Sequence, residues 1–399
     1  PKPPVVMACR MAGFVSGPVL VALIGVSGLC NGFRLAADHG EFADRAADAV
    51  LDGLKGRTWI VSNGLIDSHL LIRAHERGLV AHLLCPYRAR ERFYTDDVLR
   101  SVMADASFSD AAKLRAKSMI AYNFHMFIDD LFATDEAIGS KAVCMGLPDI
   151  WYGAKWVPIP ERLFYGGVKN AASVDPRALL SLHVNFWKEW NAFLNGNAGS
   201  AKEISYRYRV ALRRHFAFVA NNLGVTLDDL GQHQEAFNVY LKARAIAPEN
   251  ISALLNIFEM ISRGVHPEMK DTIDLELRRK VENTKERYPL WSLSRYYGYV
   301  RNYELFVRMG WSWTLSSSPG SVLAGLRSSY SIQQDEDRRA ALTSMMAALY
   351  EMRGDLDQSA AEYKKAIDLD PKNAFAISGL VRLALRQKGV DEAEKVLEQ

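Results

Sequence analysis

Apolar residues recur along this chain with three different patterns, and each pattern predicts a different kind of element. Residues 11–33 carry no charged side chain, and residues 41–54 have apolar positions at helical spacing. Three short runs, at 58–62, 79–84 and 141–145, are rich in branched and aromatic residues. Helical spacing predicts an amphipathic helix, and short runs bounded by turn residues predict strands. The alternation of strands and helices predicts parallel pairing through crossover connections.

The uncharged stretch at 11–33 is the first feature with a functional meaning. In a helix, about 23 residues cover about 35 Å, enough to cross a bilayer. Lys2 and Arg10 precede the stretch and acidic residues follow it, which places the N-terminus in the cytoplasm and the remainder outside. We therefore expect a membrane-anchored protein whose bulk is extracytoplasmic, on the periplasmic side if the source is bacterial. A cleaved signal peptide and a buried helix are the alternatives.

The elements together predict a mixed fold class in four parts. An N-terminal transmembrane helix is followed by a small three-layer α/β (Rossmann-like) domain, a connecting helix with a linker, and an all-α irregular solenoid. The corresponding residues are 1–34, 35–170, 171–200 and 201–399. Residues 148–151 and 157–160 are interpreted as an aromatic, proline-rich loop that leads to Phe164–Gly167, either a recognition loop or a loop that packs against the sheet.

Polar residues follow the first predicted strand, at the end where open α/β sheets bind ligands. They are Ser62, Asn63, Gly64, Asp67 and His69. No glycine-rich phosphate loop accompanies them, and Asn-Gly after a strand is also an ordinary turn. A ligand site and a structural turn both remain open here.

Composition and spacing argue against several kinds of chemistry. A net charge of +3 over 399 residues, with no basic run, argues against nucleic-acid binding. His69, His75 and His82 match no metal-ligand spacing, and no nucleophile lies in a pattern with a base. We therefore expect no cofactor, no metal and no catalytic residue in this chain. Cys85 and Cys144 are expected to be buried thiols, with a disulfide between them as the alternative.

Residues 217–250 carry small and large apolar side chains at fixed places on two helices. The places are filled by Leu223, Gly224, Leu227, Ala236, Tyr240 and Pro248. This pattern resembles the tetratricopeptide (TPR) repeat, whose period is about 34 residues. A second unit fits at 340–373 and a partial one at 374–399, out of phase with the first. The residues between them include an aromatic-rich segment, 288–315, which is interpreted as core or as a platform for sugar or peptide.

The resemblance implies that the first helices of the repeats form a concave surface that binds a protein or peptide. The residues expected there are Phe218, Asn221, Asn222, Val225, Asp228, Leu255, Asn256, Ser344 and Met345. The Lys/Arg/Asn set with which some members of the family bind a peptide carboxylate is missing. An apolar or mixed partner surface is therefore expected.

A second resemblance covers a longer part of the chain. The segments Trp59–Gly64, His75–Leu79, Pro148–Trp151 and Val157–Pro160 follow one another as in the extracytoplasmic tail of large polytopic membrane proteins related to protein O-mannosyltransferases. Two functions follow. The first is a membrane-anchored, extracytoplasmic TPR scaffold for protein–protein interaction. The alternative is the accessory C-terminal region of a glycosyltransferase-like membrane protein, whose α/β unit binds a glycan or nucleotide-sugar.

Overall fold

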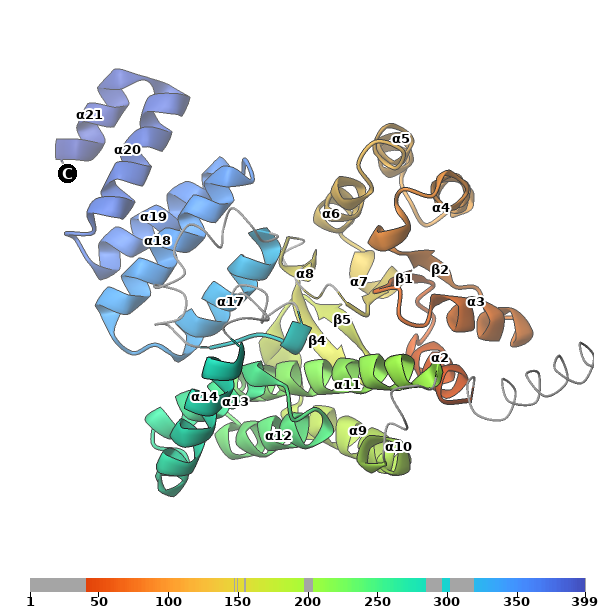
Figure 1. Ribbon diagram of the computed structural model, residues 1–399. Helices are drawn as coiled ribbons and strands as arrows, with labels where there is room; N and C mark the ends of the chain where they lie inside the picture. The colour runs from red at the N-terminus through yellow and green to blue at the C-terminus, as the bar shows by residue number, and fades with distance from the viewer. Residues whose placement is uncertain are drawn as a thin grey trace, which may run out of the picture.

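One small mixed sheet lies among many helices in the structure, a computed structural model (Figure 1). The structure describes residues 41–146, 148, 150–153, 156–196, 204–284, 296–301 and 319–398. The strands are β1 (Trp59–Val61), β2 (His82–Leu84), β3 (Ala142–Cys144), β4 (Val157–Glu161) and β5 (Phe164–Val168). Their order in the sheet is β2-β1-β3-β5-β4, with β1 parallel to β2 and β3, and β5 antiparallel to β3 and β4.

The two faces of the sheet are covered by different helices, as Figure 1 shows. Ile60 and Val143 pack in one apolar cluster with α2, α3, α9 and α11, whereas their neighbours Val61 and Cys144 pack in another with α4, α5 and α6. This alternation follows the two-residue period of a strand. The helices are α2 (Glu41–Gly53), α3 (Asp67–Glu76), α4 (Arg92–Ala104), α5 (Asp110–Met119), α6 (Phe124–Thr134), α7 (Ile138–Lys141), α8 (Ile150–Gly153), α9 (Pro176–Glu189), α10 (Asn191–Asn195) and α11 (Ile204–Asp229), with short 3-10 turns at Pro86–Arg88 and Ala171–Ser173.

The proline-rich residues interpreted as a loop form strand β4 instead, paired with β5 in a hairpin. Proline is tolerated there because β4 is the edge strand, so an N–H missing on its free side breaks no ladder bond. The carbonyl oxygen of Pro160 lies on that free side and accepts a hydrogen bond of 3.0 Å from Nε2 of the buried His183 on α9. A side chain thus closes part of the edge that another strand would otherwise pair with.

The helical half begins with the long helix α11, which packs on both the sheet and α12. Tyr240 on α12 lies against the backbone of α11 at Gly224, where an added Cβ would come within 2.5 Å of the tyrosine ring. In the later unit Tyr363 and Ala347 lie in one buried cluster, and Ser359 donates a 2.8 Å hydrogen bond to the Ala347 carbonyl. The helices are α12 (His233–Ile246), α13 (Ile251–Ser262), α14 (Lys270–Thr284), α17 (Pro319–Ile332), α18 (Glu336–Met352), α19 (Leu356–Leu369), α20 (Ala374–Lys388) and α21 (Val390–Glu398), with a 3-10 turn at Pro267–Met269.

The predicted fold class and localisation are wrong. The described residues are mostly helical with one small mixed sheet, not a transmembrane helix ahead of a three-layer Rossmann-like domain. The predicted helical solenoid is supported by the successively packed helices α11–α14 and α17–α21. Within these residues no helix combines the length and the apolar character needed to cross a bilayer, which overturns the predicted membrane-anchored, extracytoplasmic localisation. The predicted span, residues 11–33, lies outside the described part. An uncharged run of sufficient length is compatible with a span but does not require one. The predicted domain limits stay predictions.

Replacing Gly224 by alanine is expected to destabilise the protein, although alanine is the better helix former. The new methyl group would overlap the Tyr240 ring, and overpacking of this kind costs about 1–3 kcal/mol. The free energy of unfolding from urea denaturation measures the effect. Asn238→Ala, at an exposed position of α12, is the control and should change stability by less than about 0.5 kcal/mol. An equally stable Gly224→Ala protein would contradict the close contact.

Stability should fall between pH 7 and pH 5 because of His183. Burial lowers the pKa of His183 from 6.5 to about 4, so the unfolded chain takes up the proton first. The stability that neutral His183 contributes is complete above about pH 6.5 and is lost as the pH falls toward 4. The loss is about 2 kcal/mol at pH 5. His183→Gln keeps a donor for Pro160 and should flatten this pH dependence in urea unfolding. An unchanged slope in the variant would contradict the assignment.

Candidate functional site

The surface predicted to bind a partner is buried under another segment of the same chain. Residues 296–301 cross α11, the first helix of the first repeat, and α13, the helix that follows this repeat. We call the surface that they cover the first groove. Asn221, Asn222 and Asn256 are at most 2% exposed. Burial of three amide side chains requires hydrogen-bond partners, and the segment supplies them.

Both backbone polar groups of Tyr299, the C=O and the N–H, are hydrogen-bonded to asparagine side chains. Its carbonyl oxygen accepts hydrogen bonds from Nδ2 of Asn221 at 2.9 Å and from Nδ2 of Asn256 at 2.8 Å. Its N–H donates to Oδ1 of Asn222 at 2.7 Å. The groove therefore binds the backbone at this position, and the buried side chain of Tyr299 packs in the main apolar cluster.

Two further hydrogen bonds lie on either side of Tyr299, and we call the whole set of asparagine-to-backbone hydrogen bonds the ladder. The N–H of Arg301 donates to Oδ1 of Asn256 at 2.9 Å, and the carbonyl of Tyr297 accepts from Nδ2 of Asn250 at 3.1 Å. Asn250 also caps α13 through its Oδ1. Since Asn256 uses both ends of its amide on the segment, it fixes the register of residues 299 and 301.

Glycine is required at position 298 for two reasons. Its φ of +97° is a conformation that residues with a side chain rarely adopt, and an added Cβ would lie 2.5 Å from Nδ2 of Asn221 and from Oδ1 of Asn222. On either side of it, Tyr297 and Val300 pack with Ile251 and Leu255 in a small apolar cluster. The segment is thus anchored by its backbone and by two apolar side chains.

Arg301 ends the segment in a buried pocket of opposite charge. It is 1% exposed, and its guanidinium pairs with the carboxylates of Asp228 and Asp229 at the end of α11. It also donates to Oγ of Ser331 on α17 at 2.5 Å. Arg263 reaches the same Oδ2 of Asp228 at 2.7 Å. Although burial raises the pKa of Asp228, the charges of Arg301 and Arg263 outweigh it and hold this pKa below its usual value.

The remaining predicted groove residues do not line one surface. Phe218 and Val225 are buried, and Phe218 packs edge-to-face against Tyr165 of the sheet at 6.2 Å. Ser344 and Met345 lie on α18, where the Ser344 hydroxyl donates to the Ala340 carbonyl of its own helix at 2.8 Å. The structure therefore brings the residues of α11 and α13 together and leaves those of α18 in another cluster.

The polar residues after β1 are largely occupied by one another. Ser62 is hydrogen-bonded to Asp67, and Asn63 accepts from the N–H of Leu65 at 3.1 Å, as in an ordinary turn. Gly64 donates its N–H to Oγ of Ser62 at 2.9 Å. His69 lies 2.7 Å from Oδ1 of Asp44 on α2. A ligand role for these five residues stays a prediction.

The two described cysteines are buried free thiols. Burial, with Asp67 nearby, raises the pKa of Cys85 to about 11, so this thiol stays protonated and is a poor nucleophile near neutral pH. Among the residues that the structure describes, no group of three His, Cys, Asp or Glu side chains could hold a metal ion.

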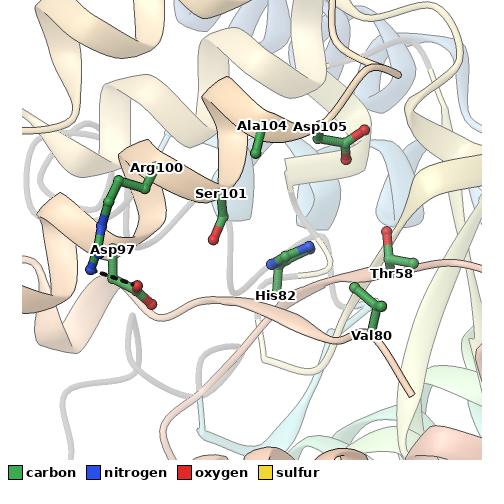
Figure 2. A pocket seen from close by; sticks show the side chains of 8 residues that line it. All are labelled: Thr58, Val80, His82, Asp97, Arg100, Ser101, Ala104 and Asp105. Carbon is green, nitrogen blue, oxygen red and sulfur yellow. Dashed lines mark hydrogen bonds and ion pairs between the residues drawn. The ribbon is translucent and has the colours of Figure 1, made fainter. Parts of the chain in front are cut away.

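A pocket of about 500 Å³ opens beside the sheet between β2 and α4 (Figure 2). His82 stacks on Trp59 at 4.5 Å, and Trp59 donates to Asp105 at 2.7 Å. Burial lowers the pKa of His82, against the opposing charges of Asp105 and Asp97. Asp97 is paired with Arg100, as Figure 2 shows. These groups satisfy one another, and their arrangement indicates no particular chemistry.

A second pocket, of about 560 Å³, lies between α18 and α20, the first helices of two successive units. We call it the C-terminal pocket. Arg353, Arg382 and Arg386 line it with one acid, Glu351, which is bound by Arg382 at 2.7 Å. Met352 is 50% exposed there. Unlike the first groove, this pocket is covered by no described segment of the chain.

Comparison with known families supports the repeats. Residues 219–250 and residues 350–399 each match a model of the tetratricopeptide repeat. These two segments of the chain are therefore similar to tetratricopeptide repeats. No curated protein matches it. The resemblance to protein O-mannosyltransferase-like proteins is not supported by either match.

Sequence reasoning missed the segment that covers the first groove. Residues 288–315 stood out as aromatic, with core and ligand platform as the two interpretations. Of the described part, Tyr297 and Tyr299 are buried and Tyr296 is 53% exposed; residues 288–295 and 302–315 lie outside the described residues. The useful signal was the glycine between two tyrosines, followed by arginine, opposite a helix face rich in asparagine.

Asn256→Ala should destabilise the protein by about 3 kcal/mol. The change removes three hydrogen bonds, two to residues 299 and 301 and one to Asn221, and leaves the buried Arg301 N–H without its acceptor. Urea denaturation measures the loss, and amide hydrogen exchange at Arg301 should accelerate. Ser262→Ala, at the exposed end of the same helix, is the control. If Arg301 stays protected in Asn256→Ala, the ladder does not hold the segment.

Proposed function

We propose that this chain is a scaffold for protein–protein interaction and that its C-terminal pocket carries the partner surface. Tetratricopeptide arrays bind proteins along the surface made by their first helices. One observation carries the proposal: the C-terminal pocket lies on first helices and no described segment covers it, whereas the first groove is filled by residues 296–301.

The lining of the C-terminal pocket supports a mixed contact. Three arginines face one glutamate, and the apolar side chain of Met352 lies exposed among them. Arg382 is bound to Glu351, while Arg353 and Arg386 make no ion pair within the described residues. Arginine and methionine are enriched at protein interfaces, where each combines apolar surface with a polar or polarizable end.

A photo-crosslinking residue at position 352 tests the proposal in the full chain. In an extract of the source cells, we expect one dominant adduct from position 352 and none from position 122, where Tyr122 is 94% exposed but far from the pocket in sequence. Arg386→Glu should reduce the adduct at least tenfold, because it reverses a charge in the pocket. Lys364→Glu makes the same charge change at an exposed position of α19 and should leave the adduct unchanged.

Two results would count against the C-terminal pocket. Equal adducts from positions 352 and 122 would indicate non-specific contact, and a loss of adduct in Lys364→Glu equal to that in Arg386→Glu would indicate a general charge effect. No adduct at position 352 in a chain that melts cooperatively would contradict the proposed surface.

A further inference from the structure

Residues 296–301 contact the first groove as a bound peptide would. The backbone leaves the helical residues 296–297 at Gly298, and four asparagines bond its N–H and C=O groups at residues 297, 299 and 301. Recognition by main-chain hydrogen bonds admits other sequences with the same backbone path, and side-chain pockets then select among them. The first groove therefore has the construction of a peptide-binding site.

Three features of the groove select a sequence. Gly298 is required by its φ and by the two asparagine side chains that touch it. Val300 enters an apolar cluster with Ile251 and Leu255. Arg301 enters the pocket of Asp228 and Asp229, where it is 1% exposed. A ligand with a cation fits this pocket, because Asp228 and Asp229 lie side by side and Arg263 pairs with Asp228 alone. Arginine suits it better than lysine, since its planar guanidinium can pair with both carboxylates and with Ser331.

We propose that the first groove is a binding site for a peptide with glycine three positions before an arginine, and that residues 296–301 occupy it as a built-in ligand. A partner presenting such a peptide replaces the segment. The first groove and the C-terminal pocket are separate sites, and each is tested by its own experiment. A tethered segment competes at an effective concentration on the order of millimolar, so the intact chain should bind free peptide weakly.

Release of the segment should expose the site. In Arg301→Glu, a third carboxylate meets Asp228 and Asp229, and the like charges repel it from the pocket. The probe is a fluorescent, end-capped peptide with the sequence of residues 296–301, followed by fluorescence anisotropy with the full chain. We expect Arg301→Glu to bind the probe at least ten times more tightly than the unaltered chain does.

Three controls make the measurement specific. The peptide with Arg301→Glu should not bind, because it lacks the cation. The peptide with Gly298→Ala should not bind, because its methyl group overlaps the asparagines. The double variant Arg301→Glu, Asn256→Ala should lose binding of the original probe, because the ladder is broken. Failure of a cooperatively folded Arg301→Glu chain to bind the probe would overturn the proposal, as would equal binding of all three peptides.

Hydrogen exchange on the unaltered chain covers the case in which Arg301→Glu does not fold. Millimolar probe should increase deuterium uptake across residues 296–301 of the chain, because displaced N–H groups lose their asparagine acceptors. The peptide with Arg301→Glu should leave uptake unchanged. Uptake that is the same with and without the original probe would overturn the proposal, whatever is found at the C-terminal pocket.

Discussion

The first repeat can assemble only if the buried amide side chains of the first groove find hydrogen-bond partners. Asn221, Asn222 and Asn256 are nearly inaccessible to water, and each polar group left without a partner would cost about 1–3 kcal/mol. An apolar side chain cannot meet this demand. A backbone segment can, because each residue other than proline carries one N–H donor and one C=O acceptor. The first repeat is therefore complete only when Tyr299, far along the chain, lies in it.

The same need of polar groups for hydrogen-bond partners explains how the sheet joins the helices. The edge strand β4 leaves the Pro160 carbonyl unpaired by any strand, and His183 of α9 satisfies it. The phenolic hydroxyl of Tyr165 accepts a 2.9 Å hydrogen bond from Asn222 on α11. One apolar cluster continues from α2 through the sheet into α13. The first repeat is consequently held on one side by the sheet and on the other by residues 296–301, which explains why it presents no open groove.

Local sequence signals predicted the elements better than their partners. The runs at 58–62, 79–84 and 141–145 contain β1, β2 and β3, because buried parallel strands are continuously apolar. The β4–β5 hairpin was missed because proline argues against a strand unless the strand is known to be at an edge. The face of α11 that forms the groove followed from the repeat pattern. Its occupant did not, because so short a segment has no periodicity and its hydrogen bonds to α11 join residues 72 to 78 positions apart.

The two repeat units show what the family pattern determines and what it leaves open. Both pack a tyrosine of the second helix against a small residue of the first, Gly224 in one and Ala347 in the other. The two units differ in the polar residues on their first helices, α11 and α18. Asn221 and Asn222 need outside partners, whereas the Ser344 hydroxyl is satisfied within its own helix by Ala340. Although Ser344 is buried as well, a face that satisfies its own polar groups needs no polar partner from another segment, whereas a face of buried amides does. The side chains outside the repeat pattern therefore decide whether a groove holds its own chain or stays available to a partner.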